Sequence, residues 1–256
     1  MILVADIGNT NIKIGIFDGD KLVDSVRLAT SAAKTADEYW MMLKDMLKAK
    51  GVAISEISGA IMSSVNPNLN YTVEHMIKAN FDFKPLVVGA GLKTGLNILY
   101  DNPREVGSDR ILGAVAAYNT YGGPCIVIDC GTATVFNAIG EKGEFLGGAI
   151  GFGLKTASEA LSQSAAKLPK VELTAPASVI NRNTIGNMQS GIVYGFIGAV
   201  EYIVGRMKTE MKCGGAIKVI ATGGLSEIIT RHTKIIDIVD RTLTLRGLNI
   251  IYRLNT

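Results

Sequence analysis

The strongest constraint on the fold of this chain is an internal repeat. Residues 6–11, Asp-Ile-Gly-Asn-Thr-Asn, align with residues 129–134, Asp-Cys-Gly-Thr-Ala-Thr. Each copy ends an apolar run, at residues 2–5 and 125–128, and each precedes further short segments separated by turn residues. Self-similarity of this kind indicates that one structural unit is used twice. We therefore expect two similar halves, each opening with a β-meander.

The hydrophobic pattern predicts a similar order of elements in both halves. Strands are expected at residues 1–6, 11–17, 21–28, 57–62 and 85–88, and again at 125–129, 134–139, 144–150, 218–221 and 235–239. Helices should begin at the capping box of residues 35–38 and at Asn66-Pro67, and others are expected at 154–167, 185–212, 225–232 and 243–254. Asp18-Gly19 is typical of a type I′ hairpin turn.

This element order predicts a particular architecture. We expect an α/β fold of duplicated RNase H-like domains, with an N-terminal half at residues 1–118 and a C-terminal half at residues 119–256. Each half should hold a mixed five-stranded sheet with flanking helices, and a cleft should lie between the halves. This is the actin-like ATPase layout of actin, hexokinase and the heat-shock chaperones.

The two repeated turns have the residues expected of a phosphate site. Gly8 and Gly131 lack a Cβ, so the backbone can approach a ligand closely and its amides can face an anion. Asp6 would repel phosphate but could hold Mg²⁺ through water, because this ion keeps most of its waters. Lys13 adds a cation for the β- or γ-phosphate. Short polar groups come from Asn9, Thr10, Thr132 and Thr134.

Other nucleotide-binding and catalytic motifs fit the sequence poorly. A P-loop needs GxxxxGK[ST], but Leu154 separates the last glycine of residues 148–153 from Lys155. The Gly-x-Gly at residues 89–91 lacks a third glycine at the dinucleotide spacing. Neither of the two histidines stands in a context typical of a serine hydrolase.

Composition and charge exclude several further classes. The net charge of +3 without a basic run suits small anionic substrates and predicts no nucleic-acid partner. The three cysteines form no CxxC pair, so we expect buried, reduced thiols rather than zinc or disulfides. The longest apolar stretch, residues 191–205, is too short to span a membrane, and no signal peptide is apparent. These features predict a cytoplasmic protein without a membrane partner.

An ordered set of motifs resembles the type III pantothenate kinases. The motifs are Asp6-x-Gly-Asn-Thr-x-x-x-x-Gly15, Asn102-Pro-Arg-Glu-Val-Gly107-Ser-Asp109-Arg110, Asp129-x-Gly-Thr-Ala-Thr134, Gly147-Gly-x-Ile150, Asn183-Thr184, Gln189-Ser-Gly191 and Thr222-Gly-Gly224. The resemblance covers nearly the whole chain, and the Gly-x-Asp-Arg element at residues 107–110 separates this family from other kinases of the fold. The chain departs from many members at Phe152, where they have proline, and at Asn137, where they have aspartate.

The resemblance implies ATP-dependent phosphorylation of pantothenate to 4′-phosphopantothenate, the first step of coenzyme A biosynthesis. It implies a homodimer that uses Mg²⁺ and a monovalent cation, K⁺ or NH₄⁺. The implied ATP-binding residues are Asp6, Ile7, Gly8, Asn9, Thr10, Asn11, Ile12, Lys13 and Thr132. The implied pantothenate-binding residues are Tyr100, Gly107, Ser108, Asp109, Arg110 and Thr184. Asp109 would be the general base, Asp129 would bind the monovalent cation, and Asp6 would hold Mg²⁺ through water.

Asp109 also has a purely structural interpretation. The apolar stripe of Ile111, Leu112 and Val115 predicts a helix with Asp109 in its first turn. A carboxylate there stabilises the helix dipole by about 0.3–1 kcal/mol, and the same position suits a proton acceptor. Arg110 could likewise bind substrate, neutralise charge on the transferred phosphoryl group, or form a surface salt bridge.

Three functions other than that of a pantothenate kinase fit parts of this sequence. One is a kinase for another small hydroxylated acceptor, and another is a non-catalytic nucleotide-binding regulator of the same fold. The intact sequence of residues 107–110 argues against the regulator. A chaperone-like ATPase would need a peptide-binding domain for which this chain is too short.

Three glycines share one face of the long helix expected at residues 185–212. Gly191, Gly195 and Gly198 each lower helix stability by about 1 kcal/mol relative to alanine. Close approach of another backbone would compensate for that loss. Our hypothesis is that this face packs tightly at a dimer contact.

Overall fold

The computed structural model describes residues 1–256, which form two compact units. The first unit comprises residues 1–95, 102–116 and 242–256, and the second comprises residues 96–101 and 117–241. The C-terminal helix α7 (Leu243–Asn255) therefore belongs to the first unit. The expected halves, residues 1–118 and 119–256, describe a duplication along the chain and stay a prediction, since compactness alone does not test them.

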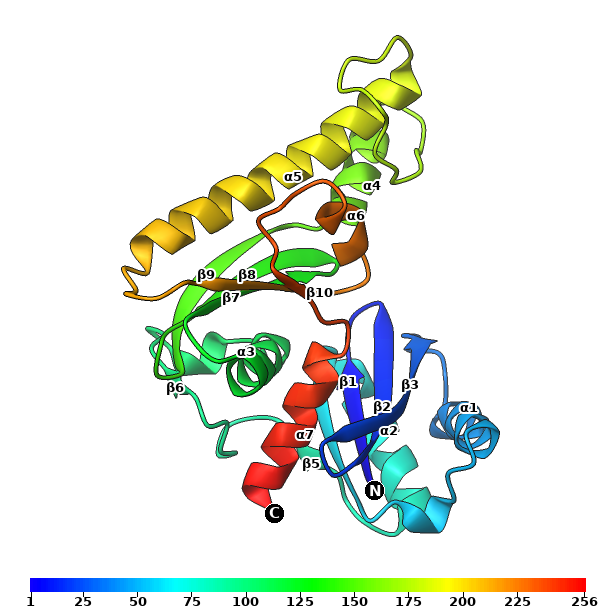
Figure 1. The fold of residues 1–256 in the computed structure, drawn as a ribbon. Coiled ribbons are helices and arrows are strands. Elements are labelled where there is room, and N and C mark those ends of the chain that lie inside the picture. The colour runs from blue at the N-terminus through cyan, green and yellow to red at the C-terminus, as the bar shows by residue number, and fades with distance from the viewer. The chain divides into compact units, whose positions relative to one another are not determined.

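The first unit is built on a five-stranded mixed sheet (Figure 1). Its strands, in the order β3-β2-β1-β4-β5, are β3 (Lys21–Ala29), β2 (Asn11–Asp18), β1 (Ile2–Ile7), β4 (Gly59–Ser64) and β5 (Leu86–Val87). The three N-terminal strands form the antiparallel meander expected from the sequence, and β4 and β5 continue the sheet in parallel. Its helices are α1 (Ala36–Ala49), α2 (Pro67–Phe81), the start of α3 (Ser108–Tyr121) and α7, with short 3₁₀ turns at Ile54–Glu56 and Pro103–Glu105.

Local sequence signals place the first helices as predicted. Thr35 caps α1 in a complete capping box with Glu38, and Gly51 follows the helix with a φ of +69°. Buried apolar side chains of α1 and α2, among them Leu43 and Val73, pack with those of β1 and β2 in one core. This core fixes the meander on which the first repeated turn lies.

The second unit repeats the same pairing scheme and adds one strand. Its order is β11-β10-β7-β8-β9-β6, from β11 (Ile238–Val239), β10 (Lys218–Thr222), β7 (Cys125–Cys130), β8 (Ala133–Ile139), β9 (Glu144–Phe152) and β6 (Asn97–Ile98). As β1 pairs with β2 and β4, so β7 pairs antiparallel with β8 and parallel with β10. The duplicated mixed-sheet fold is thus confirmed, while the expected five strands are six here because β6 pairs with the edge of β9.

One long helix covers a face of the second sheet. Helix α5 (Thr184–Glu210) lies along the strands in Figure 1, and its residues Val193, Ile197 and Val200 share a core with Ile126 and Ile128 of β7. The shorter helices of this unit are α4 (Leu154–Ser164) and α6 (Ser226–Thr230). None of the helices in the chain combines the length and apolarity needed to cross a membrane.

Two local expectations need correction. The β2–β3 hairpin turns at Gly19 and Asp20, and only Gly19 has a positive φ, +58°. This is the pattern of a type II′ turn with glycine first, not a type I′ turn at Asp18-Gly19. Strand β11 covers only the end of the expected residues 235–239, and α4 and α6 are shorter than predicted.

Candidate active site

The first repeated turn connects β1 to β2 and is closed by its own backbone. The Gly8 amide donates to the Asn11 carbonyl oxygen over 3.0 Å, and a Cβ on Gly8 would lie 2.9 Å from that oxygen. The Thr30 hydroxyl donates to the Gly8 carbonyl oxygen over 2.8 Å. The Gly8 amide is therefore engaged within the turn, and a phosphate would have to be bound by other groups of this segment.

A buried acid and a lysine face each other beside this turn. Asp6 and Lys13 are register partners on β1 and β2, and Lys13 Nζ lies 3.6 Å from Asp6 Oδ2. Asp6 is 7% exposed. Burial raises the pKa of Asp6, and the negative charge of Asp109 adds to this effect, whereas the Lys13 ammonium and a hydrogen bond from Thr244 oppose it. The pair thus places a partly exposed cation beside a buried carboxyl group with a shifted pKa, an arrangement typical of functional sites.

The start of α3 is tied to the same sheet through two serines. Asp6 and Ser63 are register partners on β1 and β4, and Ser63 Oγ donates to Ser108 Oγ over 2.8 Å. Asp109 follows in the first turn of α3, as predicted. The negative charge of Asp109 raises the pKa of Asp6, so the two carboxylates interact electrostatically within the first unit.

Gly107 makes room for the Asp109 carboxylate. A Cβ on Gly107 would lie 2.6 Å from Asp109 Oδ1, so any larger residue would displace that side chain. The same Oδ1 accepts a hydrogen bond of 2.8 Å from the Arg110 amide. Arg110 itself is buried, at 8% exposed.

The structure distributes the predicted ATP-binding residues of the first turn unevenly. Ile7 and Ile12 are fully buried in the hydrophobic core, so only their backbone could contact a ligand. Asn9 and Thr10 are exposed at the tip of the turn, and Gly8, Asn11 and Lys13 are half-buried. Side-chain contacts with a phosphate would therefore come from the tip and from Lys13.

The second repeated turn lies in the second unit, connects β7 to β8 and is one residue shorter than the first. The Gly131 amide donates to the Ala133 carbonyl oxygen over 3.1 Å. Asp129 lies beside Gly223: a Cβ on Gly223, which has a φ of +92°, would be 2.7 Å from Asp129 Oδ1. Asp129 and Thr222 are register partners, and the Thr222 hydroxyl is buried without a hydrogen-bond partner. A carboxylate beside a hydroxyl that lacks a partner provides oxygen ligands that suit a hard cation.

Helix α4 closes the second turn from the other side. The Gly153 amide and the Thr156 hydroxyl both donate to the Thr132 carbonyl oxygen, over 3.2 and 2.6 Å. A Cβ on Gly153 would collide with the carbonyl oxygens of Gly131 and Thr132. Phe152, the departure noted in the sequence, leaves its side chain 75% exposed.

The remaining predicted substrate residues, Tyr100 and Thr184, also belong to the second unit. The Tyr100 ring lies 6.2 Å from that of Phe145, and it approaches Gly147, whose φ is +113°. Thr184 begins α5, where Asn183 caps the helix by accepting from the Gly186 amide. The structure therefore groups Asp6, Lys13 and Gly107–Arg110 in one unit, and Tyr100, Asp129, Thr132 and Thr184 in the other.

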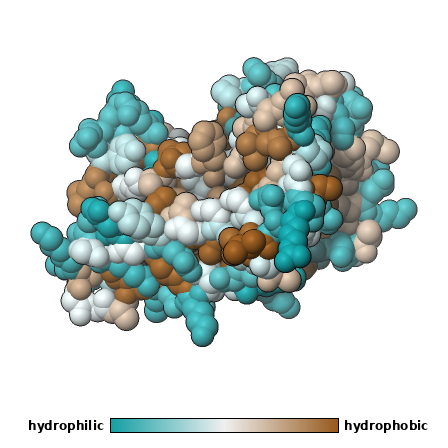
Figure 2. Space-filling model, turned by 90° about the horizontal axis from the view of Figure 1, so that it is seen from above, coloured by the Kyte–Doolittle hydropathy of each residue, from teal (hydrophilic) through white to brown (hydrophobic).

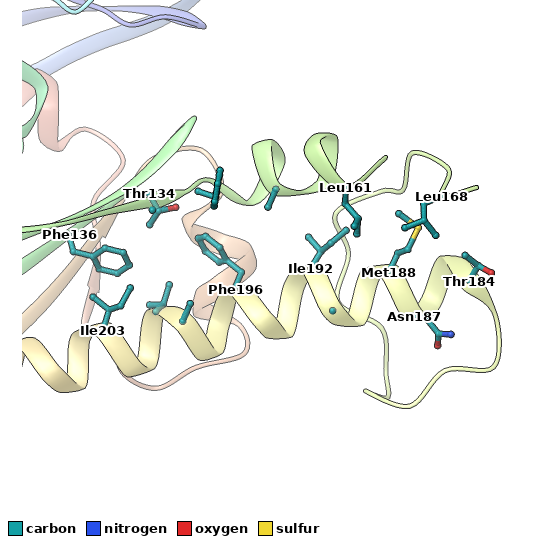
Figure 3. A pocket seen from close by; sticks show the side chains of 16 residues that line it. Thr134, Phe136, Leu161, Leu168, Thr184, Asn187, Met188, Ile192, Phe196 and Ile203 are labelled. Carbon is teal, nitrogen blue, oxygen red and sulfur yellow. The ribbon is translucent and has the colours of Figure 1, made fainter. Parts of the chain in front are cut away.

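Thr184 lines an apolar pocket of about 820 Å³ within the second unit (Figure 3). Phe196, Ile192 and Ile203 project from α5 toward Phe136 and α4, and Thr184 lies at the far end of the same helix. The remaining lining residues are Thr134, Gly151, Phe152, Ala157, Leu161, Leu168, Asn187, Met188, Gly191, Ala199 and Val200. The wall is nearly all hydrocarbon, so it suits an apolar partner better than a charged ligand.

Sequence reasoning missed two groups near Asp6. Ser63 lies on a strand without a recognised motif, and Thr244 lies in the C-terminal helix. Only tertiary packing brings them to Asp6, so no local pattern could have marked them. No group of three or more His, Cys, Asp or Glu forms a metal cage in the chain. The lone Asp6 carboxylate suits Mg²⁺ that arrives with its waters and a nucleotide.

Solved structures with this fold come from diverse proteins. A Campylobacter jejuni protein assigned to the Baf family of transcriptional activators is 20% identical, with a TM-score of 0.61, covering 99% of this chain and 98% of its own. The activator of 2-hydroxyisocaproyl-CoA dehydratase from Clostridium difficile is 14% identical, with a TM-score of 0.59, covering 99% and 94%. A ROK hexokinase from Thermus thermophilus is 11% identical, with a TM-score of 0.51, covering 98% and 97%. These likenesses show the actin-like ATPase fold.

The sequence comparison is more specific than the fold. The model of the type III pantothenate kinase family matches residues 2–206, which include both repeated turns and the Gly-x-Asp-Arg element. The family and the fold together support a kinase that uses ATP, a divalent metal and a small-molecule substrate. This chain belongs to the type III pantothenate kinase family.

Proposed function

We propose that this chain transfers the γ-phosphoryl group of ATP to the 4′-hydroxyl of pantothenate. The observation that carries the proposal is that the start of α3, which bears Asp109, is hydrogen-bonded through Ser108 to Ser63, the register partner of Asp6. A proton acceptor and a phosphate-binding cation are both needed for transfer to an alcohol. Membership of the family supplies pantothenate as the acceptor.

In this account, Asp109 takes the proton of the 4′-hydroxyl as the oxygen attacks the γ-phosphorus, and ADP leaves. Phosphoryl transfer has a loose transition state, so positioning and charge matter more than the strength of the base. Lys13 neutralises charge on the β- and γ-phosphates. Arg110 binds oxygen atoms of the acceptor or neutralises the negative charge on the phosphoryl group that is transferred.

The remaining roles follow the family motifs. Residues 6–13 of the first repeated turn bind ATP, and the family motifs also assign Thr132 of the second turn to ATP. Bound Mg²⁺, held by Asp6 through water, would neutralise phosphate charge, and Asp129 with Thr222 would hold K⁺ or NH₄⁺. Tyr100, Gly107, Ser108 and Thr184 bind pantothenate with Asp109 and Arg110.

We also propose that the active protein is a homodimer formed through the α5 face. Ile150, Phe152, Ile185 and Tyr202 are between 53% and 75% exposed. Figure 2, which views the molecule from the side of α4 and α5, shows hydrophobic side chains at this surface. An exposed apolar surface of this kind is typical of a protein–protein contact. A second copy of the chain is the partner that the family suggests.

The test is direct detection of the product. Purified protein is incubated with ATP, Mg²⁺, K⁺ and pantothenate, and mass spectrometry should find pantothenate carrying one phosphoryl group, together with ADP. A panel of other small alcohols tests the alternative hypothesis that the protein phosphorylates an acceptor other than pantothenate. ADP formation without phosphopantothenate, or faster phosphorylation of another alcohol, would refute the proposed substrate.

The alternative of a non-catalytic regulator makes a different prediction in the same assay. Such a protein would bind nucleotide without producing either ADP or a phosphorylated acceptor. The likeness to a Baf family activator does not favour it, because at 20% identity it shows the fold alone.

A further inference from the structure

The C-terminal helix brings a third group to the Asp6–Lys13 pair. Lys13 Nζ lies 3.4 Å from Thr244 Oγ1 as well as 3.6 Å from Asp6 Oδ2. Thr244 also lowers the pKa of Asp6 as a hydrogen-bonding side chain, against the effect of burial. A hydroxyl can donate and accept at once, so Thr244 can donate to Asp6 while it accepts from Lys13. Thr244 is 1% exposed, which keeps solvent from replacing it.

We propose that Thr244 is a positioning residue that holds the Lys13 ammonium and the Asp6 carboxylate ready for the nucleotide. The inference rests on the proposed role of these two residues in binding Mg²⁺ and ATP. A lysine side chain is flexible, and two fixed acceptors restrict it far more than one. With its hydroxyl contact gone, Lys13 would lose the second of these anchors.

Steric contacts of α7 fix where Thr244 lies. A Cβ on Gly247 would collide with the Leu112 carbonyl oxygen of α3, and a Cβ on Gly59 of β4 would collide with the Tyr252 hydroxyl. At Gly15 of β2, a Cβ would lie 3.2 Å from Leu245 Cδ1. Glycines therefore allow α7 to pack closely against three elements of the first unit, namely α3, β4 and β2. One of these contacts joins α7 to the helix that carries Asp109.

Thr244 also lies outside the part of the chain that the family model matches, residues 2–206. It is the second residue of α7, so its backbone belongs to the first turn of the helix. The positive end of the helix dipole is at this turn, and it favours the ionised form of a nearby acid such as Asp6. Helix and hydroxyl thus act on the same carboxylate.

The competing explanation is that Thr244 only satisfies buried polar groups. A structural role of that kind predicts reduced stability with unchanged nucleotide affinity in the folded protein. A positioning role predicts weaker binding of nucleotide in a protein that remains folded. The two can be separated because affinity and unfolding are measured independently.

The experiment compares Thr244→Val, which keeps the shape but loses the hydroxyl, with Thr244→Ser, which retains it. Binding of the Mg²⁺ complex of adenylyl imidodiphosphate is measured by calorimetry. We expect roughly tenfold weaker binding for valine, the scale of a hydrogen bond to a charged group. Thr244→Ser should bind the analogue with an affinity close to that of the wild-type protein. In turnover, valine should raise the KM for ATP more than the KM for the acceptor.

Asn249→Ala is the matched control on the same helix. Asn249 is buried and its Nδ2 donates to the Gly19 carbonyl oxygen over 2.9 Å, away from the Asp6–Lys13 pair. Its loss should lower the melting temperature and leave the affinity for the analogue unchanged. An equal loss of affinity in this control would show that any damage to α7 suffices and would overturn the proposal.

Two further outcomes would also overturn it: wild-type affinity in Thr244→Val, or a serine variant as weak as the valine variant. The result of this binding experiment does not depend on which alcohol the enzyme phosphorylates. If wild-type protein binds the analogue but does not phosphorylate pantothenate, the proposed function fails while the role of Thr244 is still decided. If wild-type protein does not bind the analogue, both fail.

Discussion

Single residues at the first turn combine burial with charges of both signs. Asp6 is almost inaccessible, yet it pairs with the Lys13 ammonium and interacts electrostatically with the Asp109 carboxylate. Such a group costs free energy in the folded state, and that cost is typical of a functional site. Asp109 differs, because it is half-buried at a helix start with room made for it by Gly107.

At Asp109 we expect the largest loss of activity with the smallest loss of stability. Asn cannot take a proton, but its side-chain oxygen can still accept from the Arg110 amide. Asp109→Asn should lower kcat by roughly 10²–10⁴-fold, the usual contribution of a general base. A coupled ADP assay measures this, with Asp45→Asn on the exposed surface of α1 as the control. Turnover near wild type would remove Asp109 from that role.

Substitution of Asp6 should lower activity, and it should also change how the stability of the protein depends on pH. Its pKa is raised in the folded protein, so the stability linked to this group is full at acid pH and is lost as pH rises through the folded pKa. The Asp6→Asn variant has no carboxyl group at this position, so it does not lose stability in this way as pH rises. In the absence of nucleotide and metal, the melting temperature of the variant relative to wild type should therefore be higher at pH 7.5 than at pH 4.

The activity of Asp6→Asn should fall by at least about 10²-fold, since a neutral amide holds hydrated Mg²⁺ poorly. Thermal melts across this pH range and a turnover assay test both parts. A variant whose relative stability falls as pH rises would contradict the sign of the shift.

At the level of elements, α7 connects the two functional segments of the first unit. Its Gly247 crosses α3 at the Leu112 carbonyl oxygen, and its first turn carries Thr244. Alanine normally stabilises a helix relative to glycine by about 1 kcal/mol. At Gly247, however, the close contact with the Leu112 carbonyl oxygen should make alanine destabilising relative to glycine.

Gly247→Ala should lower the free energy of unfolding by roughly 1–3 kcal/mol, the range for overpacking a core. Gly205→Ala in α5 is the matched control, because a Cβ there meets no atom within 4 Å. The control should be neutral or stabilising. Denaturant unfolding of both variants decides the matter, and a stabilised Gly247→Ala would show that α7 is not tightly seated.

Local signals in the sequence predict most elements of this fold but few of their contacts. Period-two alternation and turn residues give β1 to β3, and the capping box gives the start of α1. Strand β6 is two residues long and depends on an edge contact with β9, so no local pattern marks it. The turn at Gly19 follows the twist of the finished hairpin, which the dipeptide alone does not specify.

The candidate site divides in the same way. Motifs identify Asp6, Asp109 and Asp129 because each lies at a turn or helix start that needs glycine nearby. Ser63 and Thr244 are identified only by tertiary contact, since a buried serine or threonine in a strand or helix has no distinctive sequence context.

For the whole molecule, the open question is what covers the glycine face of α5. A Cβ on Gly191, Gly195 or Gly198 would meet no atom within 4 Å, so the chain itself provides no close packing there. The hypothesis of a dimer contact at these glycines therefore stays a prediction. A second copy is the partner that could still supply it.

Gly195→Leu should accordingly disturb the dimer. The larger side chain would separate the packed faces, and light scattering after size exclusion should show a shift toward monomer at low micromolar protein. Lys44→Leu adds a leucine to the exposed face of α1 and should leave the assembly unchanged. A Gly195→Leu protein with the mass of the wild-type assembly would place the contact elsewhere.

We propose above all that ATP binding depends on Asp6 of the first repeated turn and on Asp129 of the second. Calorimetric titration with the Mg²⁺ complex of adenylyl imidodiphosphate tests it most directly, on wild type, Asp6→Asn and Asp129→Asn. We expect one binding site per chain, with an affinity that either substitution weakens. Two independent sites per chain, or a site unaffected by one of the two substitutions, would contradict it.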